Sequence, residues 1–173
     1  MKVYQHTIKE PVTISGVGLH TGVVSNMTFE PAPANYGIKF QRTDLKHQPI
    51  IDADVDNVVD LSRGTSIEQD GGRINTVEHT LAAIAGLQID NILIKLDGPE
   101  PPILDGSSIQ FIEALEKVGL VEQGAQRNYF EVPESIYFRD KSNEVELAAL
   151  PSEDYRVTVM VDYKSPVLGS QHA

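Results

Sequence analysis

A glutamate and a histidine lie side by side, as Glu78 and His79, at the start of a segment that carries no other charge up to Gly86. A carboxylate can accept a proton, and a neutral imidazole can ligate a metal such as zinc. In a helix, the positive end of the dipole favours an ionised Glu78 and an unprotonated His79. The pair therefore offers a proton acceptor and a metal ligand at one point.

The same residues also have purely structural interpretations. Asn75 and Glu78 have the spacing of a capping box, and Gly86 is placed to close the helix in a left-handed turn. A single histidine at the start of a buried helix is more often a hydrogen-bonded core residue than a ligand, since zinc takes three or four protein ligands. The H-E-x-x-H pattern is absent because position 83 is alanine. The local spacing leaves both interpretations open.

Another histidine, His20, lies in the glycine-rich segment from Ser15 to Gly22. Thr21 stands where the third glycine of a dinucleotide-binding fingerprint belongs, and a predicted strand rather than a helix follows, which excludes that fold. The glycines instead predict a tight connection between strands with His20 at its tip. Such a residue is either an ordinary exposed histidine or a substrate contact, because loops carry both kinds.

Two further carboxylates, Glu100 and Asp105, lie in the proline-rich loop from Leu96 to Ser107. They could form a catalytic pair. The structural interpretation is favoured, because Asp105 and Gly106 are turn residues that lead into a helix.

The composition of the 173-residue chain is that of an ordinary globular protein, with 40% hydrophobic residues. Its formal charge of −11 argues against nucleic acid as a partner. The absence of cysteine excludes disulfides and thiolate metal sites. The amino-terminal residues lack the apolar core of a signal peptide, and no apolar run approaches the length of a membrane span. We therefore expect a cytoplasmic protein without membrane insertion.

The elements that must position these residues are short strands and two helices. The first helix runs from the Asn75 cap to Gly86, and its apolar stripe and small-residue face predict burial on both sides. The second follows Ser107, which forms a capping box with Gln110, and ends at Gly119. Strands are predicted at 3–8, 12–15, 23–29, 38–41, 57–61, 65–69, 91–96, 129–132, 135–139, 144–149 and 155–162. This order predicts an α+β fold, a two-layer sandwich of a mainly antiparallel sheet covered by two helices.

A change in character near Asn128 predicts two domains. Residues 1–127 form a first α+β domain that carries Glu78 and His79. Residues 128–173 are predicted strands that no helix covers, so they are interpreted as the incomplete beginning of a similar second domain.

Six motifs recur in order along the chain: Gly16–Gly22, Pro31–Asn35, Arg42–Leu45, Thr76–His79, Gly86–Asn91 and Pro102–Ser107. Together they resemble those of the UDP-3-O-acyl-N-acetylglucosamine deacetylases, the zinc amidases that commit the lipid A pathway in Gram-negative bacteria. The resemblance implies two similar α+β domains whose helices pack together around an active-site cleft. It also implies a UDP-acyl-aminosugar substrate and, in some relatives, fusion to a hydroxyacyl carrier-protein dehydratase.

The roles that the resemblance implies are specific to three residues. His79 matches a zinc ligand, Glu78 matches the general base that accepts a proton from the attacking water, and His20 matches a position near the diphosphate-sugar end of the substrate. The remaining Zn²⁺ ligands lie beyond residue 173, so the chain by itself is expected to be inactive. Some relatives carry a cysteine in the segment that here reads Leu61–Thr65, and this chain has none. The alternative is a non-catalytic binding or structural module of the same fold.

Overall fold

The computed structural model describes residues 3–173, which divide into two compact units. The first unit ends at Arg127 and the second runs from Asn128 to Ala173. Within residues 3–173, no helix combines the length and the apolarity that crossing a bilayer requires. That the second unit begins a second domain of similar architecture stays a prediction.

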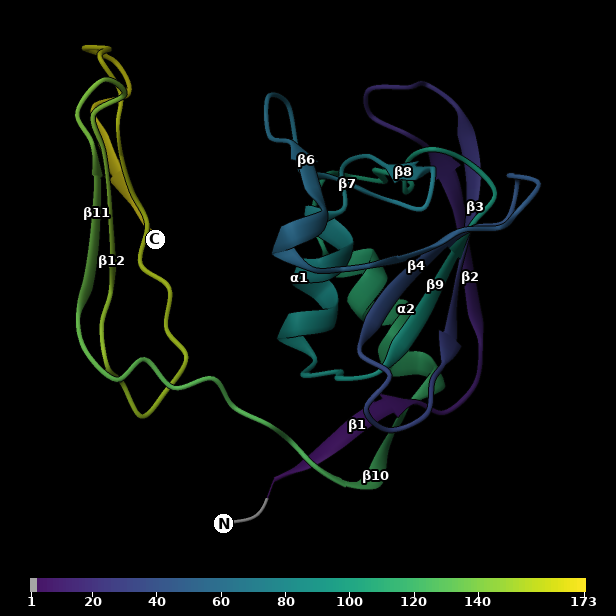
Figure 1. The fold of residues 1–173 in the computed structure, drawn as a ribbon. Helices are drawn as coiled ribbons and strands as arrows, with labels where there is room; N and C mark the ends of the chain where they lie inside the picture. Colours follow the sequence, from purple (N-terminus) through teal and green to yellow (C-terminus); the bar gives the residue numbers. More distant parts are fainter. Residues whose placement is uncertain (1–2) are drawn as a thin grey trace. The chain divides into compact units, whose positions relative to one another are not determined.

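A five-stranded sheet forms the centre of the first unit (Figure 1). Neighbouring strands pair antiparallel except β4 and β9, which run parallel. In spatial order the strands are β2 (Val12–Val17), β3 (Val24–Pro31), β9 (Ile92–Leu96), β4 (Ile38–Arg42) and β5 (Ile50–Asp52).

Only one face of this sheet is apolar, as the alternation along β9 shows. Ile92, Ile94 and Leu96 are fully buried, whereas Leu93 and Lys95 between them are half-buried. On the opposite face Lys95 forms an ion pair of 2.8 Å with Glu30 of β3. Because successive side chains of a strand point to opposite faces, this pattern gives the sheet one face for the core.

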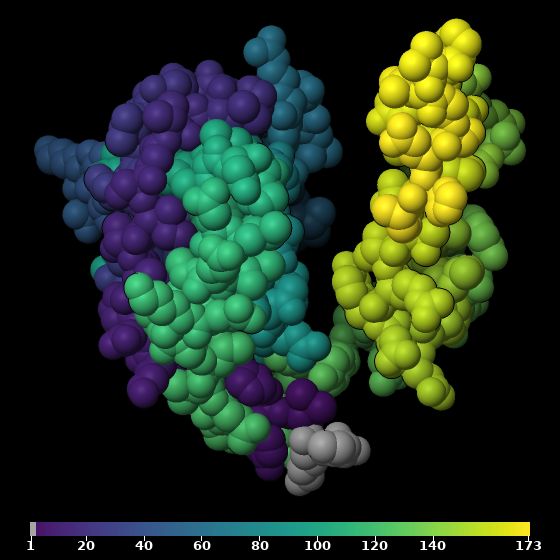
Figure 2. Space-filling model, turned by 180° about the vertical axis from the view of Figure 1, so that it is seen from behind, coloured from purple at the N-terminus to yellow at the C-terminus, as the bar shows by residue number. Residues whose placement is uncertain are grey.

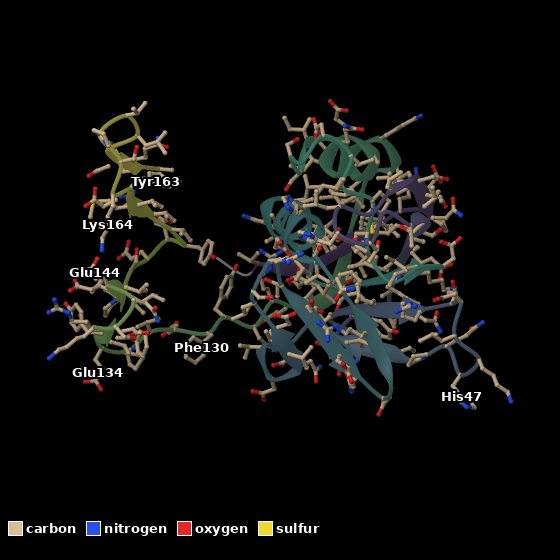
Figure 3. All side chains as sticks on the ribbon, turned by 90° about the horizontal axis from the view of Figure 1, so that it is seen from above. His47, Phe130, Glu134, Glu144, Tyr163 and Lys164 are labelled. Atoms are coloured by element: carbon tan, nitrogen blue, oxygen red, sulfur yellow. The ribbon has the colours of Figure 1, made fainter. Side chains whose placement is uncertain are left out.

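The helices α1 (Glu78–Gly86) and α2 (Ile109–Val118) lie on one side of this sheet, behind it in Figure 1 and above it in Figure 3. Seen from behind in Figure 2, the green segment with α2 covers much of the first unit. Phe111 of α2 meets Phe29 of β3 edge to face, with ring centroids 6.4 Å apart. The fold is thus mixed α/β with two helices, as predicted, and the strict two-layer sandwich stays a prediction.

Two smaller sheets complete the first unit. One pairs β1 (Tyr4–Ile8) with β10 (Leu120–Gln126), and the other contains β6 (Val58–Asp60), β7 (Ser66–Gln69) and β8 (Gly72–Ile74) after the 3₁₀ helix η1 (Val55–Asn57). Strands β5, β8 and β10 were not predicted from the sequence. The sequence of β10 shows no apolar alternation, and its Leu120 and Val121 are both 40% exposed. The segment is a strand because it pairs with β1.

The predicted capping box of α1 is wrong. Val77 is the N-cap residue, and no side chain caps the helix. The Asn75 side chain instead accepts a hydrogen bond from Ser66 Oγ at 2.9 Å, and the carboxylate of Glu78 accepts one from the backbone of Thr65. Both side chains are held by the β6–β8 sheet region, so neither is available to cap the helix.

Other details of the helices also differ from the predictions. The left-handed residue after α1 is Gln88, with φ 55°, and not Gly86. The prediction that α1 is buried on both sides is wrong for the described residues, because Ala82 and Gly86 are exposed. The capping box of α2 is wrong as well: the N-cap residue is Ser108 and it makes no side-chain cap. Gly119, with φ 81°, ends α2 as predicted.

The second unit consists of two hairpins, β11 (Ile136–Asp140) with β12 (Val145–Ala149) and β13 (Met160–Asp162) with β14 (Ser170–His172). The strand predicted at 129–132 is absent, and the one predicted at 155–162 shortens to β13. Phe130 is 90% exposed. None of residues 128–173 is buried, so these hairpins lack the packing that would extend the strands.

We expect limited proteolysis of residues 1–173 to cut the second unit first and to leave a resistant product that ends near Arg127. Local opening costs least where few apolar groups are buried, and residues 128–173 have no buried side chain. Mass spectrometry of timed digests gives the cleavage sites. Equal resistance of both units would contradict this expectation.

Candidate functional site

The candidate site brings together three segments that are distant in sequence. The first is the turn between β2 and β3 that carries His20, the second is the loop at 63–65 between β6 and β7, and the third is the start of α1. His20 Nε2 donates a hydrogen bond of 3.0 Å to the carbonyl oxygen of Arg63. The Thr65 N–H donates one of 2.9 Å to Glu78 Oε2. The middle segment therefore contacts both outer ones.

A polar cavity of about 410 Å³ opens at this junction. Its lining comes from the same segments and from β6 and β7: His20, Asp60, Ser62, Arg63, Gly64, Ser66, Asn75 and Thr76. The backbone N–H and hydroxyl of Ser62 hold the pKa of Asp60 below its usual value, helped by the neighbouring Arg73. Asp60 is thus an ionised carboxylate of the cavity wall, ion-paired with Arg73 at 3.2 Å.

The Glu78 carboxylate is half-buried and fixed against Gly64. A Cβ at position 64 would lie 2.9 Å from Glu78 Oε1. The carboxylate thus uses the space that the missing side chain leaves, while Oε2 is held by Thr65. This arrangement orients one oxygen and leaves Oε1 without a hydrogen bond to the described residues.

The His79 side chain is half-buried, and its imidazole makes no hydrogen bond to residues 3–173. Its carbonyl oxygen accepts a 3.0 Å hydrogen bond from Ser108 Oγ, which ties the first turn of α1 to the start of α2. The backbone is therefore fixed while the ring nitrogens remain available as ligands.

The donors for a metal are incomplete in this part of the protein. Among residues 3–173, no three His, Cys, Asp or Glu side chains lie close enough together to hold a metal ion. A catalytic zinc takes three protein ligands and keeps an open position. His47 lies on the loop between β4 and β5, away from the helices (Figure 3). His79 and Glu78 thus fit part of a zinc centre and do not make a whole one.

Glu100, considered from the sequence as a possible catalytic partner of Asp105, is buried at the junction of the His20 turn and the start of α1. It is 1% exposed, so it is not a surface turn residue. Its carboxylate accepts hydrogen bonds from the backbone of His20 and Thr21 and from the Thr76 hydroxyl. No local pattern in the sequence indicates this environment, because the partners of Glu100 lie 24 to 80 positions away.

Asp105 has the structural role that the sequence favours. It is exposed and accepts hydrogen bonds from the backbone N–H and hydroxyl of Ser107, just before α2. Those two hydrogen bonds lower the pKa of Asp105. The proposed catalytic pairing with the buried Glu100 gains no support, because each carboxylate is engaged by its own set of donors.

Comparisons with known proteins show what the chain is similar to. The family model for LpxC, UDP-3-O-acyl N-acetylglycosamine deacetylase, matches residues 5–173. The chain is 49% identical over its whole length to a bifunctional enzyme LpxC/FabZ of Chlorobaculum tepidum, and 44% identical over 98% of its length to one of Bacteroides thetaiotaomicron. It is 41% identical over 96% of its length to a UDP-3-O-acyl-N-acetylglucosamine deacetylase of Bdellovibrio bacteriovorus.

The chain spans only part of these relatives. It covers 37% of each of the two bifunctional enzymes and 55% of the Bdellovibrio deacetylase. The matched part is the one that contains Glu78, His79 and His20 in this chain.

We expect Gly18→Ala to destabilise the first unit by about 1–3 kcal/mol, the usual cost of overpacking. The added Cβ would lie 2.5 Å from Glu100 Oε2 and 2.6 Å from Thr21 Oγ1, and the hydrogen bonds of Glu100 prevent it from moving aside. Urea unfolding followed by circular dichroism measures the loss. The matched control is Gly124→Ala, whose Cβ meets open space. Equal stability of the two variants would show that the Gly18 contact is not tight.

We expect acid to remove a stabilising contribution of Glu100. Burial alone would raise the pKa of Glu100, but the hydrogen bonds from Thr76, Thr21 and His20 outweigh it and lower the pKa below the ordinary 4.5. A carboxyl with a lowered folded-state pKa stabilises the fold fully above its ordinary value, and this contribution is lost as pH falls through the lowered one. The difference in unfolding free energy between the wild-type chain and Glu100→Gln should therefore shrink below pH 4.5. A difference that stays constant with pH would contradict this.

Proposed function

The chain belongs to the UDP-3-O-acyl-N-acetylglucosamine deacetylase family, and we propose that the protein containing it hydrolyses the acetamide of a UDP-3-O-acyl-N-acetylglucosamine in lipid A biosynthesis. The observation that carries the proposal is the pair Glu78 and His79 at the first turn of α1, one held by Thr65 and the other with a free imidazole. An anchored carboxylate beside an available imidazole suits metal-assisted amide hydrolysis.

Glu78 is the general base in this proposal. Its Oε1 accepts the proton of the water that attacks the acetamide carbon, while the Thr65 N–H on Oε2 keeps the carboxylate from turning away. A positioned base of this kind commonly contributes ~10²–10⁴ in rate.

His79 would hold a Zn²⁺ ion together with ligands from parts of the protein outside this chain. Such an ion, when bound, lowers the pKa of water to about 7 and polarises a carbonyl group. The hydrogen bond from Ser108 to the His79 carbonyl fixes the backbone from which the ring projects. Because residues 3–173 do not bring three donors together, we propose that the chain by itself is inactive.

His20 is proposed to contact the diphosphate-sugar end of the substrate. Its ring lines the polar cavity, and the hydrogen bond from Nε2 to Arg63 fixes the tautomer, which leaves Nδ1 as an acceptor.

A cytoplasmic location follows from a nucleotide-linked substrate. The bifunctional names of two relatives support a parent that is fused to a hydroxyacyl carrier-protein dehydratase.

The alternative is a non-catalytic module in which Glu78 only anchors the loop at Thr65. A binding module needs no proton acceptor at Oε1 and no free imidazole at His79. Neither side chain lines the polar cavity, but the Glu78 carboxylate lies against Gly64 of its wall, and the retention of both groups there favours the enzyme.

The test is to compare Glu78→Gln with Glu78→Ala in the full-length protein. A glutamine can still accept the Thr65 N–H but cannot take a proton, so we expect near-normal stability with turnover lowered by ~10²–10⁴. The alanine variant should lose the same activity and also about 0.5–1.5 kcal/mol of stability. Steady-state deacetylation, thermal unfolding and bound zinc by elemental analysis are measured together. Normal turnover by Glu78→Gln would overturn the catalytic role and favour the anchoring one.

A further inference from the structure

The Glu100 carboxylate is a buried acceptor shared by two of the three segments of the site. On one side it accepts the N–H of His20 at 3.1 Å and the N–H and hydroxyl of Thr21, both at 2.8 Å. On the other side it accepts the hydroxyl of Thr76 at 2.6 Å. The backbone carbonyl of Glu100 is in turn fixed by Ser25 Oγ at 2.7 Å. The carboxylate is therefore immobile and fully engaged.

Thr76 has a backbone conformation that is unfavourable for a threonine. Its φ is 56°, in the left-handed region, which is costly for a β-branched residue. Strain of this kind persists only where the surroundings impose it. Here the short hydrogen bond to Glu100 imposes it, two residues before Glu78.

The hydrogen bonds of Glu100 are part of a closed ring of hydrogen bonds that connects the three segments of the site. From Glu100 one branch leads through the His20 turn to the Arg63 carbonyl, and the other leads through Thr76 to the start of α1. The branches meet at Thr65, whose carbonyl accepts the Val77 N–H at 3.1 Å and whose own N–H holds Glu78. A shift of Glu100 would thus alter the spacing between the His20 ring and the Glu78 carboxylate.

We infer that Glu100 is a positioning residue, whose buried carboxylate holds the His20 turn and the left-handed Thr76 in one arrangement and so sets Glu78 and His79 against His20. The inference rests on the proposed function for its effect on turnover. A carboxylate is required because all four groups that face it are donors: the N–H groups of His20 and Thr21 and the hydroxyls of Thr21 and Thr76. A glutamine amide would turn an N–H₂ toward some of these donors and leave them unpaired.

The experiment uses the full-length protein with Glu100→Gln, Thr76→Val and Thr76→Ser. Valine keeps the shape and branching of Thr76 but lacks the hydroxyl, whereas serine keeps the hydroxyl. We expect kcat to fall about ten- to a hundredfold for Glu100→Gln and Thr76→Val with KM changed far less, because misplaced catalytic groups impair the chemical step. Thr76→Ser should stay close to wild type. The control Asp97→Asn changes an exposed carboxylate of the same loop that contacts only Asn26.

A second readout does not depend on activity. Hydrogen exchange followed by mass spectrometry on peptides that span residues 16–23 reports the backbone N–H groups of His20 and Thr21. We expect faster exchange there in Glu100→Gln and unchanged exchange in Asp97→Asn. If the wild-type protein deacetylates nothing, the proposed function fails, and the exchange data still decide the role of Glu100.

Two results would overturn the inference. One is a folded Glu100→Gln protein with wild-type exchange at residues 16–23. The other is a Thr76→Val protein with wild-type kcat and only a lowered melting temperature, which is what a merely structural hydrogen bond would give. If Glu100→Gln does not fold, the two Thr76 variants decide, because serine retains the hydroxyl that Glu100 binds and valine lacks it.

Discussion

A buried carboxylate must be surrounded by donors, and this requirement at Glu100 organises the functional half of the first unit. An ionised group taken out of water is tolerated only when hydrogen bonds replace its hydration. Here the donors come from a turn near the amino terminus and from Thr76, two residues before α1, and these are more than fifty residues apart. Satisfying one side chain therefore brings together parts of the chain that share no strand or helix.

The central sheet makes this arrangement possible. Strand β9 carries three fully buried apolar residues and ends at Leu96, from which the proline-rich loop delivers Glu100. Its neighbour β3 contributes Met27 and Phe29 to the same core and begins just after the His20 turn. Both loops leave the same antiparallel strand pair, so their separation is set by the register of that pair. The apolar core thus fixes the positions of the His20 turn and of Glu100, which lie outside it.

Sequence reasoning succeeds where a pattern is local. The apolar alternation and the glycine after Val118 locate most strands of the first unit and the end of α2. It fails at the start of α1, because Asn75 and Glu78 match a capping motif and yet bind to the β6–β8 region. Strand β8 follows a turn at Asp70 and Gly71, both with positive φ, and this Asp-Gly pair between two strands is a hairpin signal present in the sequence.

In the candidate site, too, local patterns were predicted from the sequence and tertiary contacts were not. Glu78 and His79 stand out because they are the only charged or titratable residues in an apolar segment, and their meeting with the Arg63–Thr65 loop depends on tertiary contacts that spacing does not reveal. Glu100 was interpreted as a loop residue because its partners are 24 to 80 positions away. Long-range hydrogen bonds leave little trace in a single sequence.

The tight approach of Gly18 to Glu100 has an evolutionary consequence. The two positions are 82 residues apart in sequence, yet a Cβ on one occupies the place of a carboxylate oxygen on the other. A larger residue at position 18 is harmful while Glu100 is present, and a shorter residue at position 100 leaves a void while Gly18 is present. Changing both positions together would relieve the steric conflict, but the donors that face Glu100 would still lose their acceptor. Position 18 is therefore expected to stay glycine in every lineage that keeps the carboxylate at position 100.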